Sequence, residues 1–294
     1  MATARANGVD IEYETFGDPG DPAMLLIMGL GGQLIVWDEE LCRQLAGHGF
    51  HVIRFDNRDV GLSTRFDDAP VPDVIAVLQG DRASVPYTLE DMADDTAGLL
   101  DALGIDGAHV VGVSMGGMIA QLLAIDRPER VLSLASIMST TGDPSVGAPT
   151  PEAIAVLTKP PPTGREQVIA REVETTEALG SPGYGFDEDR TRRRAAAAFD
   201  RAFHPAGVAR HLGAVVAATD RTERLAKLDA TTATVVIHGS ADPLITPSGG
   251  EATAKAIPGA ELIIIEGMGH ELPPGAWPTV VEAIVANANR AARR

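Results

Sequence analysis

Short, uninterrupted apolar runs recur along the chain and alternate with segments of helical periodicity. Such runs are typical of strands buried on both faces, which occur in parallel sheets covered by helices. They predict strands over residues 23–28, 51–55, 109–111, 131–138, 234–239 and 261–265. The repeated alternation of strand and helix therefore predicts an α/β protein with a doubly wound, mostly parallel sheet.

A β-hairpin is predicted over residues 4–16, because Asn7-Gly8 is a strong turn dipeptide followed by apolar–polar alternation. Helices are predicted at about 37–46 and 278–289, and a short one is expected to end at Ala256. Thr88 to Asp91 resembles a capping box. The helix that follows is expected to end at Gly104 and to bury Leu89, Met92, Leu99, Leu100 and Leu103.

The composition changes after Ser139. Residues 140–163 are rich in Pro, Gly, Ser and Thr, and the pattern from Arg165 to about Leu228 is helical without strand-like runs. We therefore expect residues 1–139 and 229–294 to form the sheet core and residues 140–228 to form an inserted helical cap. Within this cap, Arg192–Arg194 predicts an exposed helix face paired with nearby acids, and a basic patch for a partner is the alternative.

The net charge of −17 and the pI of about 4.7 argue against nucleic acid and anionic membranes as partners, because phosphate groups need a basic surface. A neutral or apolar small molecule suits this charge better. The one cysteine, Cys42, cannot form an intrachain disulfide, and no run approaches the ~20 apolar residues of a membrane helix. With no apolar leader segment at the N-terminus, we expect a cytoplasmic protein.

The candidate chemistry centres on Ser114, which lies between a predicted strand and a predicted helix in Gly112-Val-Ser-Met-Gly116. A sharp strand–turn–helix connection needs glycine on both sides of the apex, because a side chain there would meet the neighbouring backbone. The apex hydroxyl is then held at the positive end of the helix, where it can attack an acyl carbon. The alternative is a glycine-rich connection that carries a surface serine.

Two further polar groups, Asp242 and His270, follow predicted parallel strands, and ligands bind at this edge of open parallel sheets. A serine hydroxyl needs an imidazole base, and the imidazole needs a carboxylate to orient it. We therefore predict that Ser114, His270 and Asp242 act as nucleophile, base and acid. The alternatives are His238 as the base, although it lies within a strand, and Asp143 or Glu266 as the acid.

An oxyanion hole is expected from the backbone N–H groups of Leu30, after the glycine-ended strand, and Met115, after the nucleophile. Gly29, Gln33 and Trp37 could line the substrate pocket. For Gln33 and Trp37, a helix start and core packing are the alternative interpretations.

Five motifs occur in a characteristic order: Met28-Gly29-Leu30-Gly31, Asp56-x-Arg58-x-x-Gly61-x-Ser63, Gly112-x-Ser114-x-Gly116-Gly117, Asp242 and Gly269-His270. Together they resemble the α/β-hydrolase superfamily, most closely the bacterial esterases of the aclacinomycin methylesterase type. Many relatives have histidine where this chain has Met28, and glycine is frequent where it has Asp59. The resemblance implies an α/β-hydrolase fold and hydrolysis of carboxylic esters of bulky apolar molecules, including polyketides.

The sequence thus predicts a serine esterase that needs neither a metal nor an organic cofactor. A lactonase, thioesterase, perhydrolase or carbon–carbon bond hydrolase would use the same three side chains. A non-catalytic receptor or scaffold on the same fold is the alternative from another class. The sequence does not indicate whether the protein is a monomer or a homo-oligomer.

Overall fold

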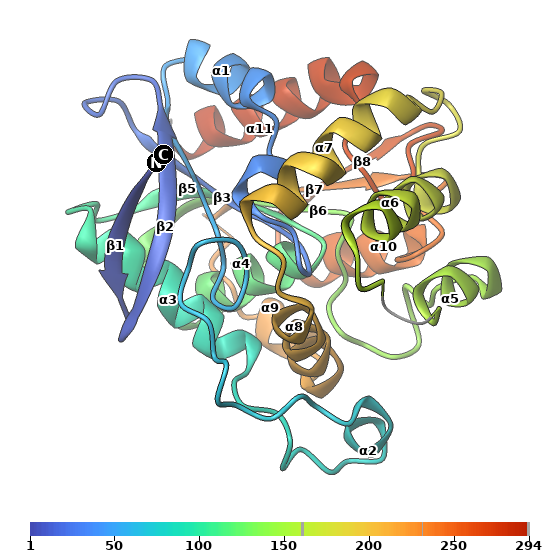
Figure 1. Cartoon of the computed structure of the whole chain (residues 1–294). Coiled ribbons are helices and arrows are strands. Elements are labelled where there is room, and N and C mark those ends of the chain that lie inside the picture. The colour runs from blue at the N-terminus through green and yellow to red at the C-terminus, as the bar shows by residue number, and fades with distance from the viewer. Residues whose placement is uncertain (160–161, 231, 293–294) are drawn as a thin grey trace.

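The computed structural model describes residues 1–159, 162–230 and 232–292. Its centre is one eight-stranded sheet with the order β1-β2-β4-β3-β5-β6-β7-β8 (Figure 1). β1 and β2 pair antiparallel, β2 joins β4 antiparallel, and all pairs from β4 to β8 are parallel. The predicted doubly wound, mostly parallel sheet is therefore confirmed. The strands are β1 Ala2–Ala6, β2 Val9–Phe16, β3 Ala23–Ile27, β4 His51–Phe55, β5 Ala108–Val113, β6 Val131–Ile137, β7 Ala233–Gly239 and β8 Glu261–Ile265.

The N-terminal hairpin turns at Asn7 and Gly8, as predicted. Both residues have positive φ, +45° and +81°, and Ala6 pairs with Val9 across the turn. Two successive left-handed residues match the twist of the flanking strands, which is why Asn-Gly is favoured there.

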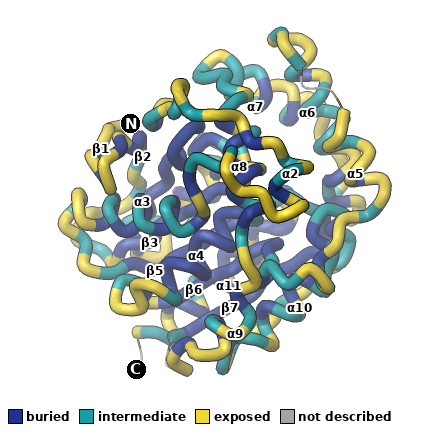
Figure 2. Tube along the Cα trace, turned by 90° about the horizontal axis from the view of Figure 1, so that it is seen from below, coloured by how far each residue is buried: buried dark blue, intermediate teal, exposed yellow. Residues whose placement is uncertain are grey.

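Helices cover both faces of the sheet, and the strand side chains alternate between the two cores. Leu25 and Ile27 pack with the core on the side of α3 and α4, whereas Met24 and Leu26 pack with the core on the side of α1 and α11. Figure 2 shows the central strands and α4 as the most continuously buried part of the chain. Helices α1 Glu39–Gly47 and α11 Trp277–Ala292 cover one face, and α3 Leu89–Ala102, α4 Met115–Asp126 and α10 Pro247–Ala256 cover the other.

The helix expected over residues 37–46 begins later than predicted. The segment Leu34–Val36 forms a short 3-10 turn, and α1 starts after Asp38, whose carboxylate accepts a hydrogen bond from Glu40 N–H. The apolar periodicity continues through the 3-10 turn and α1, so only the N-cap residue Asp38 marks where α1 begins. The capping box of Thr88 and Asp91 is present, whereas Leu103 follows the last turn of α3 and is half-buried.

Two short helices have no counterpart in the sequence analysis. Helix α2, Val74–Leu78, lies in the connection between β4 and α3, and α5, Pro151–Leu157, lies in the segment rich in Pro, Gly, Ser and Thr. Each starts after a capping side chain, Asp73 and Thr150 respectively. Both are too short for helical periodicity to stand out from loop composition.

All of the helices between β6 and β7 belong to the inserted segment, and no strand interrupts them in the described residues: α5, α6 Arg165–Leu179, α7 Glu188–Arg201, α8 Pro205–Ala217 and α9 Thr222–Leu225. In α7, Arg192 pairs with Glu188 at 2.8 Å and Arg194 lies 4.0 Å from Glu172. We propose that residues 140–228 act as the cap.

Candidate active site

Ser114 lies at the turn between β5 and α4, in the left-handed backbone conformation with φ +55°. The two motif glycines are sterically required there. A Cβ on Gly112 would lie 2.1 Å from the carbonyl oxygen of Gly116, and a Cβ on Gly116 would lie 2.1 Å from that of Ile27. The turn therefore packs directly against the end of β3, and the serine side chain stays partly exposed.

His270 connects Ser114 to Asp242. Its Nε2 lies 3.0 Å from Ser114 Oγ, and its Nδ1 lies 2.8 Å from Asp242 Oδ2. Asp242 is buried, and its other oxygen accepts hydrogen bonds from the N–H groups of Leu244 and Ile245 at 2.9 and 3.0 Å. Because a carboxylate only accepts, Nδ1 carries the proton and Nε2 is free to accept the serine proton.

The loop that carries His270 is fixed by the inserted segment. His270 N–H donates to the Leu179 carbonyl oxygen at 2.7 Å, and Gly269 N–H donates to Ser181 Oγ at 2.9 Å. A Cβ on Gly269 would lie 1.9 Å from the Gly180 carbonyl oxygen. The end of α6 thus packs on the backbone beside the imidazole and sets its position.

None of the three alternative residues, Asp143, Glu266 and His238, is hydrogen-bonded to Ser114 or His270 among the described residues. Asp143 Oδ1 accepts from both the N–H and the hydroxyl of Ser145 in a turn, and Glu266 is exposed. His238 is fully buried in β7, with Nε2 2.7 Å from the Ile245 carbonyl oxygen and 3.5 Å from Asp242 Oδ2. Burial lowers the pKa of His238, so it packs as a neutral imidazole behind the acid.

The backbone after β3 runs past the serine. A Cβ on Gly29 would lie 3.2 Å from Ser114 Cβ, so the lack of a side chain lets this loop approach the hydroxyl. Among the described residues, no acceptor is hydrogen-bonded to the N–H groups of Leu30 and Met115. Met115 is the first residue of α4, where N–H groups have no partner within the helix and the helix dipole favours negative charge.

The contacts of Gln33 and Trp37 are not those expected of side chains that line a substrate pocket. The Gln33 side-chain amide donates to the carbonyl oxygens of Ala198 and Ala202 and accepts from Arg201, so its polar atoms join the inserted segment to the core. Trp37 is fully buried among the apolar side chains under α1. Trp37 therefore packs in the core, and Gln33 joins the loop after β3 to helix α7 and the residue that follows it.

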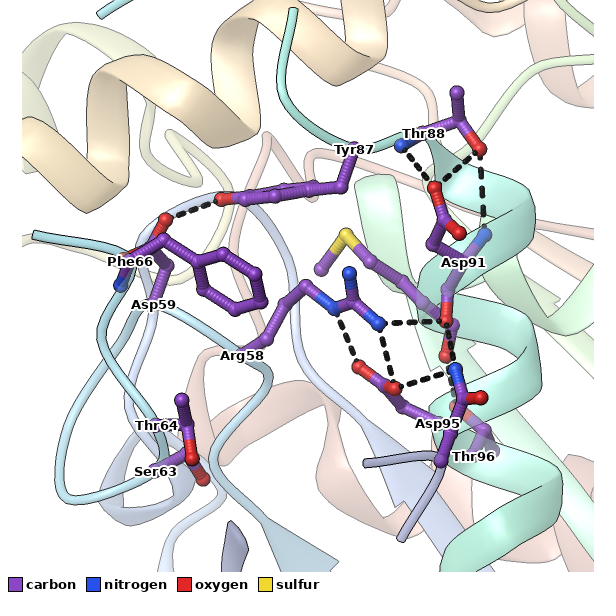
Figure 3. Close-up of polar contacts among 12 residues, drawn as sticks. Arg58, Asp59, Ser63, Thr64, Phe66, Tyr87, Thr88, Asp91, Asp95 and Thr96 are labelled. Atoms are coloured by element: carbon purple, nitrogen blue, oxygen red, sulfur yellow. Dashed lines mark hydrogen bonds and ion pairs between the residues drawn. The ribbon is translucent and has the colours of Figure 1, made fainter. Parts of the chain in front are cut away.

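Buried ion pairs that no sequence signal predicted hold the loop after β4. Asp56 accepts from Leu34 N–H at 2.7 Å and lies 2.7 Å from Arg201, while Asp59 lies 2.6 Å from Arg210 Nε. Burial alone would raise the pKa of Asp59, but the bonds from Arg210, Phe66 N–H and the Tyr87 hydroxyl lower it to about 2. Figure 3 shows the Tyr87 hydroxyl directed at Asp59. The acidic partners lie in a motif loop, but nothing in the sequence marks which arginines meet them.

None of the helices in the described part of the chain has both the length and the apolarity needed to cross a membrane. Within the same residues, no group of three or more histidine, cysteine, aspartate or glutamate side chains is arranged to hold a metal ion.

Comparison with known proteins shows the family to which the chain belongs. A model of the alpha/beta hydrolase fold family matches residues 22–274. The chain is 33% identical over 302 residues to rhodomycin D methylesterase DauP of Streptomyces sp. (strain C5), with 96% of each chain covered. It is also 33% identical over 303 residues to rhodomycin D methylesterase DnrP of Streptomyces peucetius, again with 96% of each covered.

The fold is also that of solved hydrolases. The meta-cleavage product hydrolase CumD of Pseudomonas fluorescens IP01 superposes with a TM-score of 0.76 at 20% identity, covering 99% of this chain and 98% of that one. At this identity the likeness concerns the fold alone. The family model and the two methylesterase relatives, each matched over 96% of its length, show that the chain belongs to the α/β-hydrolase fold family and is a carboxylic ester hydrolase.

Proposed function

We propose that the protein hydrolyses carboxylic esters through a covalent acyl-enzyme formed on Ser114. The observation that carries this proposal is the continuous hydrogen-bonded chain from Ser114 Oγ through His270 to Asp242, at 3.0 and 2.8 Å. A serine hydroxyl becomes a nucleophile only when a base within this distance takes its proton, and the carboxylate stabilises the resulting imidazolium.

In the first half-reaction, Ser114 Oγ attacks the ester carbonyl carbon while its proton moves to His270 Nε2. The carbonyl oxygen takes up the negative charge, which the N–H groups of Leu30 and Met115 stabilise. The tetrahedral intermediate then expels the alcohol, which leaves with the proton from His270. In the second half-reaction, water attacks the acyl carbon while giving a proton to His270. The bond from the acyl carbon to Ser114 Oγ then breaks, His270 returns the proton to Oγ, and the carboxylic acid is released.

The proposed substrate is an ester of a bulky apolar molecule. The chain is similar over 96% of its length to rhodomycin D methylesterases, which supports a methyl ester of a bulky apolar acid as the substrate. We call residues 29–31, which follow β3 and carry Leu30 N–H, the oxyanion loop. Exposed apolar side chains border it: Leu30 is 37% exposed, and Val208 and Leu212 of α8 are 37% and 40% exposed. A Cβ on Gly31 would lie 3.1 Å from Val208, which indicates that α8 and this loop form one apolar surface. An apolar ligand would be buried there without desolvating a charge.

A fluorophosphonate probe tests the mechanism, because it forms a covalent bond only with an activated serine. We expect stoichiometric labelling of the wild type at Ser114, no labelling of Ser114→Ala, and full labelling of the control Ser145→Ala. An unlabelled wild type, or undiminished labelling of the Ser114 variant, would refute the proposal.

A substrate panel on the purified protein tests the second half of the proposal. Methyl esters of polycyclic aromatic acids should be cleaved with a higher kcat/KM than lactones, thioesters or acetyl esters of small alcohols. A clear preference for a lactone or thioester would replace the substrate while leaving the acyl-enzyme mechanism in place.

A further inference from the structure

The inserted helix α8 contacts the oxyanion loop through a buried histidine. His211 is fully buried, and its Nδ1 accepts a hydrogen bond from Gly31 N–H at 3.2 Å. Its Nε2 lies 2.7 Å from the Arg58 carbonyl oxygen. One imidazole from α8 therefore bridges the loop after β3 and the loop after β4.

Only one protonation form of His211 satisfies both contacts. The Arg58 carbonyl oxygen can only accept, so Nε2 must carry the proton, and Nδ1 then offers a lone pair to Gly31 N–H. Burial lowers the pKa of His211 to about 4, so the imidazole is neutral at pH 7. The bridge is therefore complete under ordinary conditions, with no polar atom of the ring unpaired.

Arg58 is a rigid anchor for this bridge. Its guanidinium makes two hydrogen bonds to Asp95, at 2.6 and 2.7 Å. It also lies over the rings of Phe66 and Tyr87, 5.2 and 5.1 Å from their centres (Figure 3). The backbone of α8 is close-packed nearby, because a Cβ on Gly207 would lie 1.9 Å from the Asp59 carbonyl oxygen. A bond from His211 thus ties the oxyanion loop to a part of the molecule that cannot easily shift.

We propose that His211 is a positioning residue for ester hydrolysis, which holds the Leu30–Gly31 peptide so that Leu30 N–H faces the developing oxyanion. The inference rests on the proposed function. The Gly31 N–H that His211 binds belongs to the peptide plane directly after Leu30, and Gly31 has φ +68°, a conformation that glycine can easily leave. Preorganised donors stabilise an oxyanion because they need no reorientation as charge develops. Helix α8 therefore contributes to the rate of the reaction as well as to the pocket.

Two conservative variants separate the contacts of His211. An asparagine oxygen is attached to Cγ, as Nδ1 is in histidine, so H211N can still accept from Gly31 N–H. A glutamine amide reaches one bond further, toward the position of Nε2, so H211Q keeps the Arg58 contact and loses the Gly31 contact. We expect H211Q to lower kcat by roughly 10- to 100-fold with KM nearly unchanged, because a donor displaced by about 1 Å loses most of its effect. We expect H211N to stay within roughly 3-fold of the wild type.

The matched control is H109N, which alters another buried imidazole, paired with Ser133 at 2.9 Å at the start of β5. It should lower the melting temperature and leave kcat unchanged in the folded protein. Equal kcat in the wild type, H211N and H211Q would overturn the inference, as would an equal loss in both variants or a change confined to KM. Fluorophosphonate labelling of the wild type at Ser114 establishes separately that the proposed mechanism holds.

A measurement on the wild type covers the case in which the variants fail to fold. The Gly31 amide should exchange its hydrogen slowly, at a rate typical of a buried hydrogen-bonded group, although it lies in a loop. The exposed Gly185 amide, whose N–H has no acceptor among the described residues, is the reference for fast exchange. Exchange of the Gly31 amide at that rate would show that His211 does not hold this peptide.

Discussion

Ser114 holds a backbone conformation that costs a non-glycine residue on the order of 1–3 kcal/mol. The surrounding hydrogen bonds maintain it: Ser114 N–H donates to the Ile137 carbonyl oxygen at 2.9 Å, and its own carbonyl oxygen accepts from Gly117 N–H at 2.9 Å. The strained conformation directs the hydroxyl out of the sheet toward His270. The position of the Ser114 hydroxyl is therefore set by the backbone.

The carboxylate of Asp242 gives a prediction at the same scale. Asp242→Asn keeps the shape of the side chain but cannot hold the Nδ1–H form of His270 as a charged acceptor. We expect kcat to fall by roughly 10³- to 10⁴-fold with the fold intact. The control Asp143→Asn removes the competing carboxylate and should keep kcat within about 2-fold of the wild type.

Steady-state kinetics with p-nitrophenyl acetate, together with circular dichroism for the fold, would check both substitutions. A large loss in the Asp143 variant combined with an active Asp242 variant would reverse the assignment of the acid.

The sequence predicts the three residues at the strand ends because strand, turn and helix signals surround each of them locally. Ser114, Asp242 and His270 meet in the structure at hydrogen-bonding distances. The Ser114–His270 contact spans 156 residues of chain, but a motif marks each partner. By contrast, no motif marks the partners of Gln33 and His211, which lie 165 or more residues away for Gln33 and 153 or more for His211. No local pattern encodes such contacts, so their roles could be found only in the folded chain.

At the scale of elements, helices α7 and α8 are attached to the loop after β4 by buried ion pairs. Arg201 meets Asp56 and Arg210 meets Asp59, and the four side chains are largely or fully buried. Helix α8 also packs against α2, where a Cβ on Gly213 would lie 2.4 Å from the ring of Pro72. The helical periodicity of the sequence predicts α7 and α8. Their packing on the sheet domain depends on the Arg201–Asp56 and Arg210–Asp59 ion pairs, which the periodicity does not indicate.

The Arg210–Asp59 pair allows a stability prediction. Arg210→Met leaves the Asp59 carboxylate buried without its cation, which should lower the free energy of unfolding by about 3–5 kcal/mol. The matched control is Arg192→Gln in α7, where arginine and Glu188 are 47% and 52% exposed. It should change the free energy of unfolding by less than about 0.5 kcal/mol, because solvent screens exposed pairs.

Urea unfolding followed by tryptophan fluorescence would measure both values. If Arg210→Met cost no more than the control, the buried pair would contribute nothing to the docking of α8.

At the scale of the whole molecule, buried histidines couple stability to pH. Burial lowers the pKa values of His109, His211 and His238, so each folds as a neutral imidazole. For His211 the pKa falls from 6.5 to about 4. Between these values the unfolded chain binds a proton that the folded chain does not, so stability decreases as the pH falls.

We therefore expect the free energy of unfolding to decline as the pH falls from about 6.5 to 4, with His211 alone contributing roughly 3 kcal/mol. In H211Q this contribution is absent, so its stability should depend less steeply on pH over that interval. Urea titrations at several pH values would compare the two slopes. Parallel curves for the wild type and H211Q would show that His211 does not titrate with unfolding.

The strand order also bears on how the protein acquires its activity as it is made. Ser114 follows β5, whereas His270 follows β8 and Asp242 follows β7. The inserted helices are translated between β6 and β7. A chain emerging from the ribosome can form β1 to β6 with the Ser114 hydroxyl in place and no imidazole beside it. Under the proposed mechanism, the nascent protein therefore cannot cleave esters until its last two strands have docked.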